Sequence, residues 1–172
     1  IMTNDSIVGV YSVASKIYGM AKNVFVAAIT VLMPRIAYYM GNQEDDKIKK
    51  IINIAMSGLL IILIPCIILL IFYSKTVMYI ISGEGYISGS SALQLLSIAL
   101  FFAILGSLLS TSIMVPNRME KKIAVLVGIS ALTNVLLNLV LIPYGGAAAA
   151  AFTTVVAEAI VCIGSIYYSR QY

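Results

Sequence analysis

Five apolar stretches, each long enough to cross a bilayer, limit the folds open to this chain more than any other feature. A helix needs about 20 apolar residues to span a hydrocarbon core of roughly 30 Å. Only helices and closed barrels satisfy their backbone hydrogen bonds in lipid. The sequence therefore predicts an all-α integral membrane protein, with one transmembrane domain over residues 1–172. The predicted spans are residues 7–33, 48–72, 92–115, 123–143 and 146–168.

The composition leads to the same class. Hydrophobic residues make up 61% of the chain and charged residues 10%, whereas about a quarter of the residues in soluble domains are charged. Polar or turn-forming sequences separate the spans: GNQEDDKIKK, YSKTVMYIISGEGYISGSS, PNRMEKK and PYGG. A short interfacial helix is expected over residues 75–82. Pro65 is expected to kink the second span where neighbouring helices satisfy the freed carbonyl.

The basic residues of the loops predict the orientation. Eight lie on one predicted side and only Lys75 lies on the other. Because cytoplasmic loops are enriched in lysine and arginine, the C-terminus is predicted to be cytoplasmic. The eight are Arg35, Lys47, Lys49, Lys50, Arg118, Lys121, Lys122 and Arg170.

Enzymatic chemistry has no support in the sequence. Histidine is absent, and Cys66 and Cys162 both lie in apolar runs without metal-ligand spacing. No nucleophile motif or phosphate-binding glycine loop is present. We therefore predict no catalytic residue, no metal and no cofactor. The net charge of +4 follows from the loop lysines and arginines, so no nucleic-acid partner is predicted.

A polar stripe runs along the first span. On a helical wheel its polar residues occupy an arc of about 120°, and the rest of the helix is apolar. Such a stripe must face protein or water, because lipid cannot solvate it. Its members are Ser12, Ser15, Lys16, Gly19, Lys22, Asn23 and Thr30.

Three interpretations of the two lysines compete. Lys16 could extend its ammonium group to the interface. Either lysine could pair with Glu158, the one acidic residue deep in a span, and Glu158 could instead serve ion coupling. The third interpretation is an aqueous cavity that receives an anionic substrate. We favour the cavity, because the single carboxylate of Glu158 can neutralise only one of the two lysines and leaves the other positive charge without a partner.

Other polar residues in the spans favour helix packing. Asn134 and Asn138 are spaced i, i+4, with Ser130 one turn earlier, so all three share one helix face. Hydrogen bonds between helices are the expected role of such a face.

With these segments identified, the chain resembles a known family. IVGVYSVASKIYGMAKNVFVAAITVLMPRIAYYM, ALQLLSIALFF and NVLLNLVLIPYGGAAAAAFTTVVAEAIV occur in the order typical of bacterial polysaccharide-export flippases. This is the O-antigen and capsule repeat-unit family, in the superfamily that also holds multidrug-extrusion proteins and lipid II flippases. The order and spacing of the segments carry the resemblance, and no single motif does.

The resemblance implies a location and partners. Members of the family have two six-helix lobes around a central cavity in the bacterial cytoplasmic membrane. By this likeness the chain is most of a C-terminal lobe. Its partners would be the bilayer, a preceding N-terminal lobe, a polyprenyl diphosphate-linked oligosaccharide and, as a candidate, polysaccharide polymerase machinery. The start IMTNDSIVGVYS lacks the pattern of a signal peptide and reads as a loop within a longer chain.

Alternatives to polysaccharide export remain open at this point. A lipid II flippase carries a lipid diphosphate too. A cation-coupled multidrug exporter would be expected to have acidic cavity residues for cationic drugs. A non-transporting membrane scaffold predicts that the polar stripe is dry and buried against helices.

Overall fold

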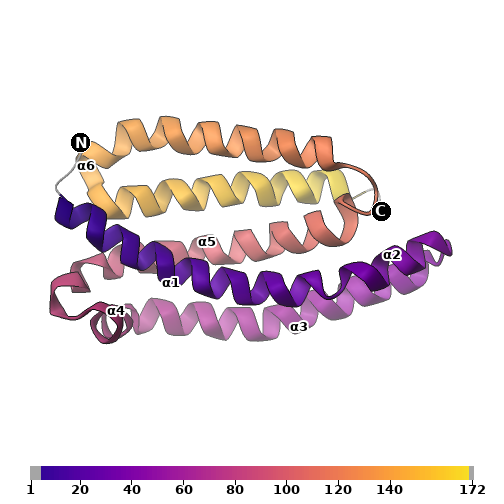
Figure 1. The fold of residues 1–172 in the computed structure, drawn as a ribbon, viewed down its shortest axis with the longest axis horizontal. Helices are drawn as coiled ribbons and strands as arrows, with labels where there is room; N and C mark the ends of the chain where they lie inside the picture. The colour runs from indigo at the N-terminus through magenta and orange to yellow at the C-terminus, as the bar shows by residue number, and fades with distance from the viewer. Residues whose placement is uncertain (1–4, 171–172) are drawn as a thin grey trace.

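The computed structural model describes residues 5–170, and every element within them is helical, which confirms the all-α prediction (Figure 1). Short turns join the elements, and one π-helical turn, η2, extends α5. The elements are α1 (Asp5–Thr30), α2 (Met33–Gly41), α3 (Asp45–Phe72), α4 (Ser74–Ser82), η1 (Glu84–Gly89), α5 (Ser90–Leu109), η2 (Ser110–Met114) and α6 (Glu120–Ser169).

Within residues 5–170, four stretches of helix are long and apolar enough to cross a membrane, and the last, α6, is long enough to cross twice. Its 50 residues reverse direction at Gly146, where φ is 50° and ψ is −130°. A side chain disfavours that backbone conformation, so glycine suits the position. Figure 1 shows the result as two antiparallel arms, residues 120–145 and 147–169. The reversal falls within the PYGG sequence that separates the fourth and fifth predicted spans.

Several boundaries differ from the predicted spans. The first was expected to run to residue 33, whereas α1 ends at Thr30 and α2 starts at Met33. Pro34 explains the break, because its ring tolerates the first helical turn and disrupts a helix interior. α3 and α5 begin a few residues before their predicted starts. The short helix expected over 75–82 is present as α4, and α3 continues without interruption through Pro65.

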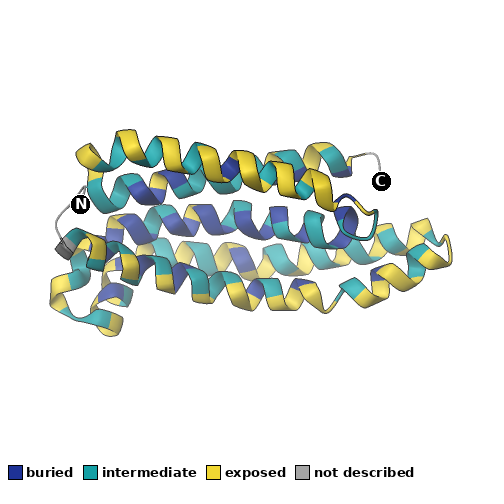
Figure 2. Cartoon of the chain, turned by 45° about the horizontal axis from the view of Figure 1, so that its top comes forward, coloured by how far each residue is buried: buried dark blue, intermediate teal, exposed yellow. Residues whose placement is uncertain are grey.

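The centre of the bundle is α5. Over the most apolar part of the helical run from Glu84 to Met114, which contains α5, 56% of the residues are buried, against 6% over the corresponding parts of α3 and α6. α5 packs against α1, α3 and α6, and buried residues follow its length (Figure 2). Gly106 lets the second arm of α6 approach closely, since a Cβ there would lie 3.3 Å from Cys162 Cα. The large apolar side chains left exposed on α3 and α6 suit a lipid environment.

The basic loops gather at one end of the bundle. The α2–α3 turn, the loop before α6 and the described end of the chain lie at the same end, and α4, with Lys75, lies at the other (Figure 1). The structure thus brings together the loops that the charge pattern assigned to one side. Which end faces the cytoplasm remains a prediction.

Candidate functional site

A carboxylate, an ammonium group and a phenol meet inside the bundle. Lys22 Nζ lies 2.5 Å from Glu158 Oε1, to which it donates a hydrogen bond. The Tyr18 hydroxyl donates a second hydrogen bond to the same oxygen at 2.8 Å. The side chains of Lys22 and Glu158 are 29% and 19% exposed, so the pair is largely withdrawn from the surface.

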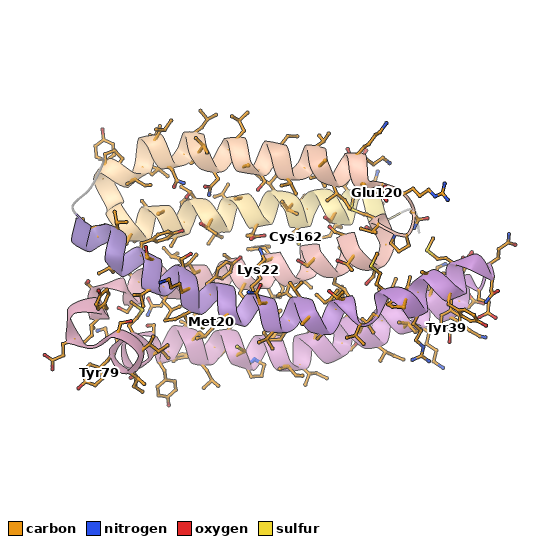
Figure 3. The ribbon with its side chains drawn as sticks, viewed as in Figure 1. Met20, Lys22, Tyr39, Tyr79, Glu120 and Cys162 are labelled. Atoms are coloured by element: carbon orange, nitrogen blue, oxygen red, sulfur yellow. The ribbon has the colours of Figure 1, made fainter. Side chains whose placement is uncertain are left out.

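Helical spacing explains how α1 forms its half of this cluster. Tyr18 and Lys22 are four residues apart and lie on one face, with Lys22 Nζ 5.6 Å from the Tyr18 ring centroid. The second arm of α6 carries Glu158 toward that face, and Figure 3 shows Lys22 directed into the space beside Cys162. The sequence analysis missed Tyr18, although its i, i+4 spacing from Lys22 was a usable signal.

The ion pair borders a cavity of about 370 Å³ between α1, α5 and the two arms of α6. A water molecule occupies about 30 Å³ in the liquid, so the cavity has room for several. Hydroxyl groups supply most of the remaining polar lining: Ser107, Ser110, Thr111, Ser130 and Thr154.

The polar stripe of α1 divides into two edges. Ser15, Gly19 and Lys22 are partly covered and form the inward edge. The outward edge is exposed and consists of Ser12, Lys16, Asn23 and Thr30.

The two cations of the stripe have different surroundings. The hydroxyl groups of Ser12 and Thr30 donate hydrogen bonds to carbonyls of their own helix at 2.8 and 2.9 Å. Lys22 forms an ion pair with Glu158. Among the described residues, Lys16 forms no ion pair and Asn23 no side-chain hydrogen bond. An ammonium group and an amide inside a span need water or a polar partner. The outward edge is therefore a surface that lipid alone does not suit.

Comparison with known proteins identifies the family of this chain. A family model described as "Lipid II flippase MurJ" matches residues 3–172. The chain belongs to the MurJ lipid II flippase family. No curated protein and no solved structure matches it. The match supports the flippase superfamily and transport in place of catalysis, and it does not support the O-antigen and capsule branch specifically.

In this flippase the two arms of α6 are joined by a side-chain network. The Asn138 amide donates to Asn134 Oδ1 at 2.9 Å, and the Thr153 hydroxyl donates to Asn138 Oδ1 at 2.6 Å. Asn134 donates to Thr153 at 3.4 Å, and Ser130 donates to the carbonyl of Ala157 at 2.8 Å. These contacts are hydrogen bonds within or between the arms. Pro65, which was expected to kink the second span where neighbouring helices pack against it, lies within the continuous α3.

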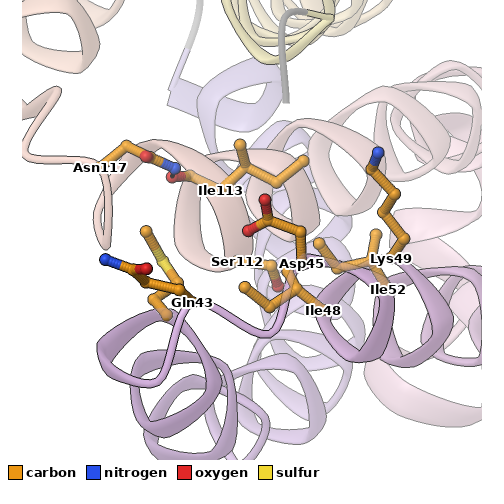
Figure 4. A pocket seen from close by; sticks show the side chains of 9 residues that line it. Gln43, Asp45, Ile48, Lys49, Ile52, Ser112, Ile113 and Asn117 are labelled. Atoms are coloured by element: carbon orange, nitrogen blue, oxygen red, sulfur yellow. Dashed lines mark hydrogen bonds between the residues drawn. The ribbon is translucent and has the colours of Figure 1, made fainter.

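A second polar cavity, of about 560 Å³, lies at the end of the bundle with the basic loops (Figure 4). It separates the start of α3 from η2, and Gln43, Asp45 and Asn117 line it. Ser112 also lines it and is buried, and its hydroxyl has no hydrogen-bond partner among the described residues. The lining contains both signs of charge, so it lacks the cationic excess expected of a diphosphate site.

Proposed function

We propose that this chain is part of a flippase that moves a lipid-linked sugar diphosphate across the bacterial cytoplasmic membrane, with lipid II as its cargo. The observation that carries the proposal is the outward edge of α1, where Lys16 is exposed and unpaired among the described residues. A diphosphate is the anionic part of such a cargo, and a lysine ammonium group is a suitable point-charge partner for phosphate.

The charge of the stripe supports an anionic cargo over a cationic drug. Glu158 neutralises Lys22, and Lys16 is left over. A cavity for cationic drugs would be expected to leave a carboxylate over instead. The family match favours lipid II over an O-antigen or capsule repeat unit among the lipid diphosphates.

Lys22 is proposed to exchange partners during transport. An incoming diphosphate near the inward edge would compete with Glu158 for the ammonium group, and Tyr18 would keep one hydrogen bond on the carboxylate. The carboxylate would thus remain partly satisfied when Lys22 moves. Rocking of two lobes about a central site is the accompanying motion expected of such transporters.

The remaining partners and the orientation complete the proposal. The outward edge of α1 would face a second lobe across a water-filled cavity, and the end with the basic loops and the C-terminus would face the cytoplasm. A scaffold role predicts instead that the outward edge is covered by protein and dry.

Transport by purified protein in vesicles tests the proposal. The protein, in the form in which the cell makes it, is reconstituted with fluorescent lipid II, and movement is followed by quenching from outside. Lys16→Gln is expected to lower the rate by about tenfold, since a hydrogen bond to a charged group is worth about 1.5–3 kcal/mol, and Lys16→Arg should keep most of the rate.

Three results would contradict the proposal. Unchanged transport by a well-folded Lys16→Gln protein would remove the cargo role of Lys16. Faster movement of an O-antigen lipid diphosphate than of lipid II would assign the chain to the polysaccharide branch. Transport of a cationic dye in place of either lipid would assign it to drug export.

A further inference from the structure

A basic pocket lies between α2 and the first turns of α3, apart from the polar stripe. It has a volume of about 380 Å³. Arg35, Lys47 and Lys50 line it, together with apolar residues that include Ile51 and Ile54. Three cations beside apolar residues match the two parts of an anionic phospholipid, a phosphate headgroup and its acyl chains.

An aromatic ring organises the cations. Tyr39 lines the pocket, with Arg35 Cζ 6.0 Å and Lys47 Nζ 5.4 Å from its ring centroid. Both distances are within cation–π range, so the ring holds two positive groups close to one another. Glu44 pairs with Lys47 at 2.9 Å, which leaves the charges of Arg35 and Lys50 in excess.

The face of α3 that continues from the pocket toward the C-terminal end of this helix is open and apolar. Ile54 and Ile61 are 61% and 72% exposed, and a Cβ at Gly58 would meet no atom within 4 Å. Helical spacing aligns these three residues with Lys47, because Ile54 follows it by seven residues, Gly58 follows Ile54 by four and Ile61 follows Gly58 by three. An acyl chain can therefore extend along α3 from a headgroup held at the pocket.

The position of the pocket suits the inner leaflet. The pocket is at the end of the bundle where the basic loops gather (Figure 1), the end predicted to be cytoplasmic. Basic pockets between transmembrane helices on that side bind anionic headgroups. The adjoining face of α3 is apolar, whereas the outward edge of α1, proposed for the cargo, is polar.

We propose that this pocket is a binding site for an anionic phospholipid of the inner leaflet. The headgroup phosphate lies among Arg35, Lys47 and Lys50, and an acyl chain covers Ile54, Gly58 and Ile61. The site is independent of the transport proposal, because none of its residues belongs to the polar stripe or to the cavity beside Glu158.

Native mass spectrometry of the protein, in the form in which the cell makes it, tests the site. The probe is phosphatidylglycerol, offered in nanodiscs with an equal amount of phosphatidylcholine. The triple change Arg35→Gln, Lys47→Gln and Lys50→Gln should lower retained phosphatidylglycerol by about tenfold or more, since the headgroup phosphate loses all three of its basic partners.

The chain offers a control matched in charge. Arg118→Gln, Lys121→Gln and Lys122→Gln remove one arginine and two lysines at the same end of the bundle, outside the pocket. This control should change retention by less than about twofold. Equal losses in the two triple variants would overturn the proposal, because they would show only diffuse attraction to the membrane surface.

Two further arms separate the lipid from other phosphates and check the apolar wall. Inorganic diphosphate should not displace the bound phosphatidylglycerol, and displacement would reassign the pocket to a soluble anion or to the cargo. Ile54→Ser together with Ile61→Ser should lower retention while the cations remain. Unchanged retention in that variant would exclude the acyl-chain path.

Discussion

Lys16 and Lys22 lie about 9 Å apart along the axis of α1, and their surroundings differ in every respect that sets the cost of a buried charge. Lys22 is partly covered and bonded to a carboxylate that Tyr18 also contacts. Lys16 is exposed and forms no ion pair among the described residues. The difference teaches that one polar stripe can serve two purposes, with its inward edge holding the bundle together and its outward edge left for water or a ligand.

Removal of the shared carboxylate should have the largest effect on this contrast. Glu158→Ala strands the Lys22 ammonium group and is expected to destabilise the protein by about 3–5 kcal/mol. Unfolding in mixed micelles with increasing dodecyl sulfate measures the loss. Glu120→Ala, which removes an exposed carboxylate in the first turn of α6, is the control and should cost less than about 1 kcal/mol.

A double variant sharpens that result. Lys22→Ala combined with Glu158→Ala leaves no unpaired charge, so it should be more stable than either single variant. Additive losses would mean that the two groups act independently, and the inward edge would then not depend on their pairing.

Loss of the phenol should have a smaller effect. Tyr18→Phe removes one of the two hydrogen bonds to Glu158 and should cost about 1–2 kcal/mol in the same unfolding assay. Tyr11→Phe is the matched control, because its hydroxyl makes only a 3.4 Å contact with Thr154. If Tyr11→Phe lowered the free energy of unfolding as much as Tyr18→Phe, the hydrogen bond from Tyr18 to Glu158 would make no specific contribution to stability.

The two edges should also differ in access to water. With Cys66 and Cys162 replaced, cysteines at Lys16 and Asn23 should react with a water-soluble maleimide about tenfold faster than a cysteine at Ala14, which is fully buried. Equal slow rates at all three positions in the intact protein would support the scaffold interpretation.

Neutralisation of the outward lysine should have the least effect on stability. Lys16→Ala should change the free energy of unfolding by less than about 0.5 kcal/mol, since no carboxylate is left unpaired. The same variant should still lose transport. A large loss of stability would reveal a structural partner for Lys16 outside the described residues.

Much of this arrangement follows from the sequence, because hydropathy and helical periodicity are local properties. The wheel of α1 brings Lys16, Lys22 and Asn23 onto one stripe, and the reversal at PYGG follows from proline and glycine. Which edge of the stripe turns inward depends on how α1 packs against α5 and α6, and no local pattern contains that information. Lys22 and Glu158 are 136 positions apart in the chain. The sequence therefore identified both residues as candidates for an ion pair but could not predict that they are in contact.

The reversal at Gly146 has a consequence for how the protein enters the bilayer. Asn134, Asn138 and Thr153 are costly in lipid as single groups, and each finds a partner within the hairpin formed by the two arms. These three groups can therefore enter the bilayer already paired, whereas Glu158 on the second arm finds its partners only on α1. A change that straightens Gly146 would separate the three, so its first effect should be failed membrane insertion.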